Sequence, residues 1–243
     1  MSRDLSQFDP LDPFGPHAFY AAQDASRARL AALKGTATSP VCWLLGNGPS
    51  LLRLLGPINA SPLPKIGTNK ALGAVWPLTY HVIAHQEHLS EPVPGFLGAE
   101  ATGARFASLE REGRLLVHGD LGERGLSIPI SHASLFSTDL SAGASEGTAA
   151  TGGSVLLVAM QLAYHLGHRT FLLAGCECQG GKFYAPERSA PAVQARMLDL
   201  WRLVAPLLAP LGVSAYLVEP GEGAAATAVW PTMPLADALA IGG

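Results

Sequence analysis

The sequence has few charged residues and no cluster of basic ones. Charged side chains make up 14% of its 243 residues, and the formal net charge is −3. Nucleic-acid binding relies on grouped Lys and Arg side chains that neutralise phosphates, so this composition argues against a nucleic-acid partner. Hydrophobic residues make up 48% of the chain, which is enough for a large core.

Long apolar runs are also lacking. No stretch approaches the length of about 18 residues that a transmembrane helix requires, so we expect no membrane-spanning segment. The opening MSRDLSQFDPLDPFGPH is acidic and Pro-rich, without the apolar core of a secretory signal. We therefore expect a cytoplasmic protein.

Cysteine is scarce as well. The three cysteines are Cys42, Cys176 and Cys178, and the last two form C-x-C rather than the C-x-x-C of redox or zinc sites. This low, odd count is typical of reduced thiols. We interpret Cys176 and Cys178 as core or site-lining thiols, because a free cysteine packs like a small hydrophobic residue.

What the sequence does contain is an alternation of short apolar runs with helical patterns. Such alternation predicts βαβ units, so we expect a Rossmann-like α/β fold: a doubly wound, mostly parallel sheet with helices on both faces and Val41–Leu45 at its centre. The expected strands are Val41–Leu45, 63–67, 80–84, 114–118, 170–175 and Ser214–Val218. The expected helices are 17–34, 51–55, a short one at 69–75, 154–167 and 190–211.

Some segments give no clear pattern. Residues 90–113 cannot be assigned, and the Gly-, Ser- and Ala-rich stretch 119–153 is long for a loop, which indicates a functional segment or a helix not recognised. We divide the chain into a lead-in with a helix (1–38), a Rossmann-like nucleotide-binding domain (39–220) and a C-terminal tail (221–243).

The first candidate motif is Gly46-Asn47-Gly48-Pro49-Ser50, between the first strand and a helix that we expect to stop at Gly56-Pro57. Glycines there permit positive φ, and the unpaired N–H groups and dipole of a helix N-terminus favour phosphate. Ser50 would offer its hydroxyl. The motif matches neither G-x-G-x-x-G nor a P-loop, so a plain βα turn is an equally good interpretation.

A second motif, Thr151-Gly152-Gly153-Ser154, opens the apolar helix 154–167. Thr151 or Ser154 would cap that helix, and the paired glycines allow a ligand close to the backbone. In a parallel sheet both helix N-termini lie at the carboxyl edge, where ligands of this architecture bind.

Other candidates follow strand ends. His85 is a candidate general base or ligand contact, and with His88 at i, i+3 it has metal-ligand spacing, although two ligands do not make a site. Glu177 would hold Mg²⁺ or a hydroxyl, or is simply a solvated loop carboxylate. Gly180 to Arg188 is expected to be a mobile loop whose Lys182, Tyr184 and Arg188 contact phosphate, or only carry exposed charges.

Taken in order, these motifs resemble the MptE-like family. The matching residues are GNGPSL at 46–51, Ile66-Gly67-Thr68-Asn69, TGGSVL at 151–156, Ala163-Tyr164-His165-Leu166-Gly167 and LAGCEC at 173–178. That family includes archaeal 6-hydroxymethylpterin diphosphokinases and is similar to motility-associated glycosyltransferases, and the GNGPS turn also resembles bacterial sialyltransferases that use CMP-sialic acid.

The resemblance implies that Gly46, Asn47, Gly48 and Ser50 hold the donor phosphate or ribose, that Asn69 lines the nucleotide pocket, and that 151–154 faces the same ligand. Family members often carry Asp where this chain has His85 and Glu177. The loss of an acidic residue disfavours Mg²⁺-assisted pyrophosphoryl transfer, whereas transfer from a nucleoside-monophosphate sugar needs no metal for its leaving group.

The sequence thus predicts a nucleotide-dependent transferase with His85 and Glu177 as catalytic candidates, a nucleotide or nucleotide-sugar donor and an unknown acceptor. Glycosyl transfer is the favoured hypothesis. Transfer of pyrophosphate from ATP to a pterin-like alcohol, with Mg²⁺, and a non-catalytic nucleotide-binding module are the alternatives. The sequence leaves the oligomeric state open.

Overall fold

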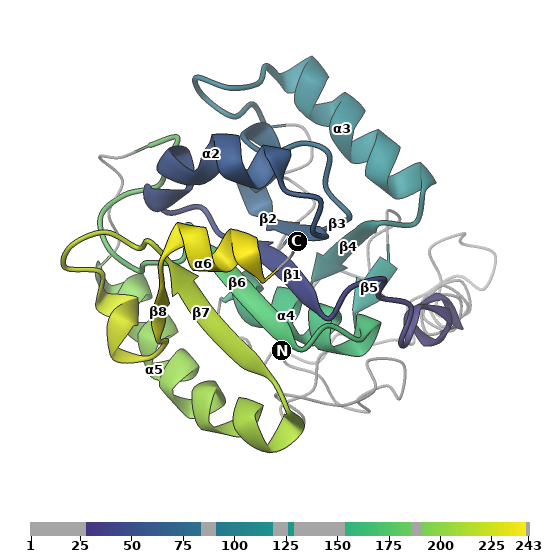
Figure 1. The fold of residues 1–243 in the computed structure, drawn as a ribbon. Coiled ribbons are helices and arrows are strands. Elements are labelled where there is room, and N and C mark those ends of the chain that lie inside the picture. Colours follow the sequence, from purple (N-terminus) through teal and green to yellow (C-terminus); the bar gives the residue numbers. More distant parts are fainter. Residues whose placement is uncertain (1–27, 84–90, 119–125, 129–153, 186–190, 242–243) are drawn as a thin grey trace, which may run out of the picture.

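The computed structural model describes residues 28–83, 91–118, 126–128, 154–185 and 191–241. Within these ranges eight strands form one sheet in the order β5-β4-β3-β2-β1-β6-β7-β8, and every neighbouring pair is parallel (Figure 1). The strands are β1 Val41–Leu45, β2 Lys65–Thr68, β3 Tyr80–Ile83, β4 Leu115–His118, β5 Leu126–Ile128, β6 Thr170–Ala174, β7 Ser214–Val218 and β8 Thr232–Met233. The α/β fold with a parallel sheet is confirmed.

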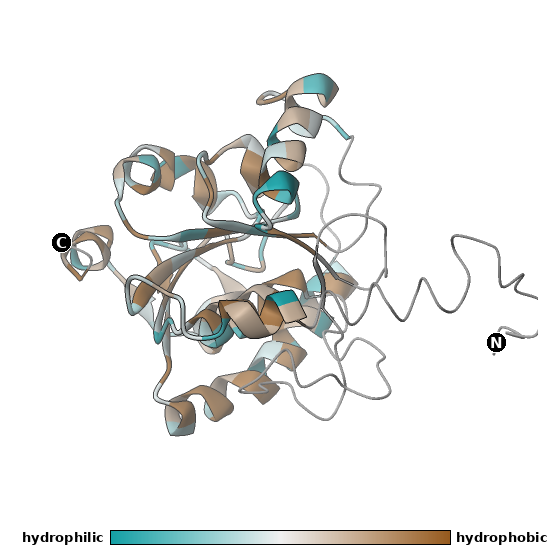
Figure 2. Ribbon diagram, turned by 90° about the vertical axis from the view of Figure 1, so that its right-hand side faces the viewer, coloured by the Kyte–Doolittle hydropathy of each residue, from teal (hydrophilic) through white to brown (hydrophobic). Residues whose placement is uncertain are grey.

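Helices cover both faces of this sheet. They are α2 Ser50–Ala60, α3 Ala99–Arg111, α4 Val155–Leu166, α5 Pro191–Leu208 and α6 Leu235–Ala240, with short 3₁₀ segments at Asn69–Gly73, Ala209–Leu211 and Ala225–Ala228. Figure 2 shows the sheet nearly edge-on between the two helical layers, with much of the sheet coloured as hydrophobic. This is the doubly wound arrangement that the alternating pattern predicts.

The central strand β1 shows why the sheet needs both layers. Cys42 and Leu44 pack in the cluster with α4 and α5, whereas Val41, Trp43 and Leu45 pack with α2, α3 and α6. All five residues of β1 are buried. An uninterrupted apolar run is typical of a parallel strand covered on both faces, and the prediction that Val41–Leu45 is central is confirmed.

Helix α2 continues beyond its predicted end. We expected Gly56-Pro57 to stop it, but it continues to Ala60 with Pro57 inside. A proline disfavours helical backbone at a preceding residue with a Cβ, and Gly56 has none. Burial of Ile58 beside Leu54 and Leu51, at helical spacing, holds the last turn in place.

Four of the described strands and helices were not predicted, namely α3, β5, β8 and α6. The unassigned stretch contains α3, which buries only Thr102, Phe106 and Leu109 and is therefore weakly amphipathic. The last residues, which the sequence analysis sets apart as a tail, add β8 to the sheet beside β7 and place α6 in one helical layer. Among the described helices none is long and apolar enough to cross a membrane.

The strand order reverses direction between β1 and β6. From β1 the chain moves through α2 to β2 on one side, and from β6 it moves through α5 to β7 on the other. The carboxyl ends of β1 and β6 therefore diverge at a topological switch point, the position where open α/β sheets leave a crevice for ligands.

Candidate functional site

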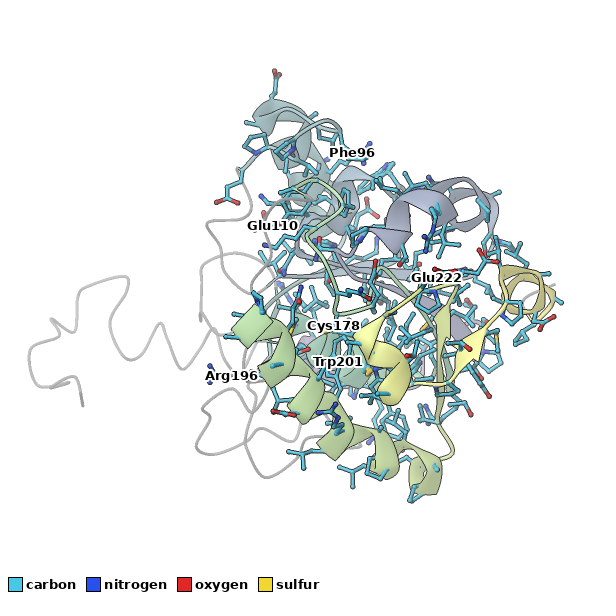
Figure 3. The ribbon with its side chains drawn as sticks, turned by 90° about the vertical axis from the view of Figure 1, so that its left-hand side faces the viewer. Phe96, Glu110, Cys178, Arg196, Trp201 and Glu222 are labelled. Atoms are coloured by element: carbon cyan, nitrogen blue, oxygen red, sulfur yellow. The ribbon has the colours of Figure 1, made fainter. Side chains whose placement is uncertain are left out.

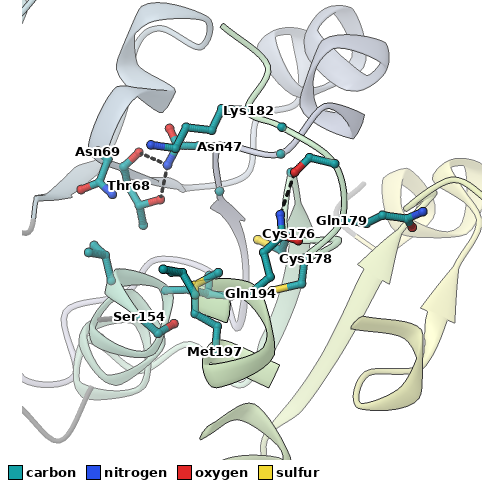
Figure 4. A pocket seen from close by; sticks show the side chains of 18 of the residues that line it. Asn47, Thr68, Asn69, Ser154, Cys176, Cys178, Gln179, Lys182, Gln194 and Met197 are labelled. Carbon is teal, nitrogen blue, oxygen red and sulfur yellow. Dashed lines mark hydrogen bonds between the residues drawn. The ribbon is translucent and has the colours of Figure 1, made fainter. Parts of the chain in front are cut away.

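A cavity of about 260 Å³ lies at this switch point. Its walls come from the ends of β1, β2 and β6, the start of α4, one face of α5 and the loop after β6 (Figure 4). The lining residues are Gly46, Asn47, Gly48, Thr68, Asn69, Ser154, Val155, Leu156, Gly175, Cys176, Cys178, Gln179, Gly180, Gly181, Lys182, Val193, Gln194, Met197 and Trp201. We call this cavity the switch-point pocket.

The lining of the switch-point pocket divides by chemistry. Asn47, Thr68 and Asn69 form a polar wall at the ends of β1 and β2, while Met197 and Trp201 of α5 contribute apolar surface. Lys182 is the only charged side chain among the described lining residues. An apolar pocket with a few polar groups and one cation suits a small ligand that carries a negative charge.

The glycines of the GNGPS turn serve close packing rather than unusual torsion angles. Glycine would permit positive φ at both positions, but neither Gly46 nor Gly48 adopts it. A Cβ on Gly46 would overlap the carbonyl oxygen of Gly175, and a Cβ on Gly48 would overlap the carboxylate of Glu177. The turn needs glycine because the segment after β6 passes directly against it.

Because of this packing, we expect two glycine-to-alanine substitutions to change the free energy of unfolding in opposite directions. We expect Gly46→Ala to lower the free energy of unfolding by about 1–3 kcal/mol, since the neighbouring obstacle is backbone. Gly103→Ala, within α3 and with open space around it, should raise it by about 0.5–1 kcal/mol through helix propensity. Urea unfolding of the two variants checks the pair, and equal effects would contradict the close-packing explanation.

The N-terminus of α2 already holds an anion, which is the carboxylate of Glu177. The backbone N–H of Ser50 donates to Glu177 Oε1 at 2.5 Å, and the Ser50 hydroxyl donates to Oε2 at 2.8 Å. Ser50 Oγ in turn accepts the N–H of Gly175 at 3.1 Å. Glu177 is 4% exposed and neither it nor Ser50 lines the pocket. These two predicted site residues contact each other, and Glu177 occupies the place where the sequence analysis put a phosphate.

The N-terminus of α4 opens on the pocket instead. Ser154, Val155 and Leu156 line it, and the first N–H groups of a helix lack partners within the helix. Ser154 Oγ accepts the indole N–H of Trp201 at 2.9 Å, which directs its own O–H elsewhere. Ser154 forms no side-chain bond to its own helix. The start of α4 thus combines a helix dipole with a buried hydroxyl, a good setting for an anion.

The loop after β6 closes one side of the pocket, and two hydrogen bonds hold its described part. The N–H of Phe183 donates to the Asn47 carbonyl at 2.8 Å, and Gln194 of α5 donates to the Gly180 carbonyl at 2.7 Å (Figure 4). Lys182 lines the pocket, and its Nζ lies 5.6 Å from the ring centre of Tyr184, which does not line it. The sequence predicts a mobile loop at Gly180–Arg188, and these contacts hold its described part against β1 and α5.

Two thiols lie in the pocket wall. Burial, with a smaller contribution from the Glu177 carboxylate, raises the pKa of Cys178 to about 12. The same causes raise the pKa of Cys176 well above its ordinary value. Because the thiolate is the nucleophilic form, neither cysteine is set up for covalent catalysis at neutral pH. Both therefore shape the pocket, which Trp201 also lines (Cys178 and Trp201 are labelled in Figure 3).

The polar wall is built by Asn47 and Asn69, both predicted as site residues. Asn47 Nδ2 donates to the Thr68 carbonyl at 3.3 Å, and its Oδ1 accepts the N–H of Lys70 at 3.1 Å. Asn69 sits between those two residues with φ +47°. A strained turn braced on both sides is typical of a functional site.

Several predicted residues lie outside the described part of the chain. These are His85, His88, Thr151, Gly152, Gly153 and Arg188. The wall from α5, formed by Val193, Gln194, Met197 and Trp201, was missed because these residues follow the ordinary pattern of a packed helix. Thr68 was missed although it follows a predicted strand, a position that could have identified it.

His81 of β3 is fully buried beneath this site. Burial lowers its pKa to about 4, although its contact with the Asn69 carbonyl opposes the shift. The unfolded chain, with a pKa near 6.5, therefore binds more protons than the folded chain below that pH. The stability that His81 contributes is complete above about pH 6.5 and is lost as pH falls towards 4.

We expect this difference to reduce the free energy of unfolding by about 3 kcal/mol between pH 6.5 and 4. Burial also lowers the pKa of His168, which acts in the same direction. Urea unfolding from pH 7 to 4 measures the total slope, and His81→Leu should remove the His81 part of it. An equal pH dependence in the variant would contradict the assignment.

Among the described residues, no group of three or more His, Cys, Asp or Glu side chains is arranged to hold a metal ion. No protein-family model matches the chain, and neither a curated protein nor a solved structure matches it significantly.

Proposed function

We propose that this chain is a nucleotide-dependent transferase, and that it acts as a glycosyltransferase that uses a nucleotide-activated sugar. The observation that carries the proposal is the switch-point pocket, where Lys182 and the N-terminus of α4 supply the positive charge. A phosphate at the start of α4 would accept from the first N–H groups of that helix and from the Ser154 hydroxyl. The base or ribose would lie against Met197 and Trp201.

The proposed phosphate site is the N-terminus of α4, whereas the sequence motif predicts the N-terminus of α2. Glu177 satisfies the N-terminus of α2, so a second anion there would meet a buried carboxylate. The two negative charges would repel each other, and the repulsion is stronger where water is excluded. The two helix N-termini at the carboxyl edge therefore have different roles: α2 is capped from within the protein, and α4 is left for the ligand.

The position of Glu177 also favours glycosyl over pyrophosphoryl transfer. Its carboxylate is directed at Ser50 and lies outside the pocket lining, so it is poorly placed to hold Mg²⁺ against a ligand's phosphates. Transfer of pyrophosphate relies on bridging metal to neutralise charge, whereas departure of a nucleoside monophosphate from a sugar does not. His85 remains the candidate base of this proposal.

A thermal-shift screen tests the function. We expect CMP or UDP, without Mg²⁺, to raise Tm by about 5–10 °C at concentrations near 100 times Kd. A shift with ATP that requires Mg²⁺ would support the diphosphokinase instead. No shift with CMP, UDP, GDP, ATP or a pterin would overturn nucleotide binding altogether.

A further inference from the structure

A polar side chain is buried where an apolar one would be expected. His81 is fully buried on β3, on the face of the sheet that packs against α2 and α3. Its ring makes an edge-type contact with the ring of Phe106, with 5.4 Å between the two ring centres. Gly67 on the neighbouring strand β2 leaves room for the ring, because a Cβ there would lie 2.7 Å from His81 Nδ1. The absence of a side chain at Gly67 on β2 thus makes room for the imidazole of His81.

The hydrogen bonding of His81 fixes its tautomer. Nε2 lies 2.8 Å from the carbonyl oxygen of Asn69, and a carbonyl only accepts, so Nε2 carries the proton. Nδ1 is then an acceptor, and it has no partner among the described residues. A buried acceptor left unpaired costs about 1–3 kcal/mol. Stability alone would therefore favour an apolar residue at this position.

The contact of His81 fixes a turn that belongs to the pocket. Asn69 has φ +47°, in the left-handed region that Asn adopts more readily than most residues with a Cβ. Asn47 bonds to Thr68 and Lys70 on either side of it, and His81 holds the carbonyl between them. Asn47, Thr68 and Asn69 all line the switch-point pocket (Figure 4).

We propose that His81 is a positioning residue for nucleotide binding: its Nε2–H holds the Asn69 carbonyl and so keeps the 68–70 turn in the shape that forms the polar wall of the pocket. It does not touch the ligand. Its contribution is preorganisation, since a wall fixed before binding loses less conformational freedom when the ligand arrives. The inference rests on the proposed function for the identity of the ligand, but not for the hold on the turn.

Two variants distinguish the hydrogen bond that His81 donates from the volume that its side chain fills. His81→Gln places an amide N–H near the position of Nε2, whereas His81→Leu fills the space without a donor and removes the unpaired acceptor. We expect both to fold, with Tm at pH 7 in His81→Leu at or above that of the unmodified protein. Thermal melts verify this before any binding is measured.

The first measurement needs no ligand. Hydrogen exchange of the Lys70 amide, which Asn47 holds, should be about tenfold faster in His81→Leu and near normal in His81→Gln, as expected when one hydrogen bond is lost and restored. Unchanged exchange in His81→Leu, or equal acceleration in both variants, would overturn the inference.

The second measurement is calorimetric titration with CMP, UDP, GDP and ATP. Kd should rise about tenfold in His81→Leu, the equivalent of one hydrogen bond, and recover in His81→Gln. An unchanged Kd in His81→Leu would overturn the positioning role. If none of the four nucleotides binds the unmodified protein, the proposed function fails, while the exchange measurement still decides whether His81 holds the turn.

Discussion

Replacing Glu177 by alanine is expected to lower the free energy of unfolding by about 3–5 kcal/mol, the largest stability change that we predict for one side chain. Its carboxylate accepts hydrogen bonds from the backbone N–H and the hydroxyl of Ser50. Each hydrogen bond to a charged group contributes about 1.5–3 kcal/mol, and the alanine would leave both donors buried without an acceptor. Helix α2 would also lose the negative charge at its N-terminus.

Guanidinium or urea unfolding measures this loss. Glu222→Ala, which removes an exposed carboxylate elsewhere on the surface, is the matched control and should change stability by less than about 0.5 kcal/mol. Glu177→Gln keeps the shape and one acceptor oxygen, so it should fall between the two. If Glu177→Ala unfolds at the same denaturant concentration as the control, the carboxylate is not the cap of α2.

The second large effect concerns binding. We expect Lys182→Glu to weaken nucleotide binding by about 100-fold, because a charge-assisted contact is lost and a repulsive one is introduced. Lys182 is the only charged side chain among the described pocket-lining residues, so no neighbour on that wall replaces it. The effect should be greatest at low ionic strength, since salt screens the contact of an exposed cation.

Arg196→Glu provides the matched control for net charge. Arg196 is exposed on α5 (Figure 3) and is not among the residues that line the pocket. The substitution reverses the same charge but removes only a long-range attraction. We therefore expect the calorimetric Kd of Arg196→Glu for nucleotide to stay within about threefold of that of the unmodified protein. Equal weakening by both variants would show that the phosphate responds to overall charge and not to Lys182.

The parts of the fold that the sequence predicts are those with dense local signals. The strands Val41–Leu45 and Ser214–Val218 were predicted with their observed bounds, because each is a short apolar run flanked by chain-breaking residues. Helix α3 was missed because three buried positions among alanines and polar residues give little periodicity. Local patterns predict an element only when its apolar residues are closely or periodically spaced.

The candidate site divides in the same way. The position of the GNGPS turn at the carboxyl edge follows from the order of strands and helices, and Asn47 and Asn69 do line a pocket there. The carboxylate that caps α2 could not be predicted, because Ser50 and Glu177 are 127 positions apart in the chain. Motif reasoning identifies a helix N-terminus but not which anion occupies it.

The placement of β1 also has a consequence for the order in which the protein assembles. Its two sheet neighbours are β2, which follows closely, and β6, which is paired from Val41↔Thr170 onward. During synthesis, one edge of the most apolar strand therefore stays unpaired until most of the chain has left the ribosome. Contacts between such distant segments slow folding, because the entropy of closing the intervening loop is lost before the contact forms. The pocket, which lies between β1 and β6, is then completed late, and a nascent chain that stalls before residue 170 presents an open, aggregation-prone strand edge.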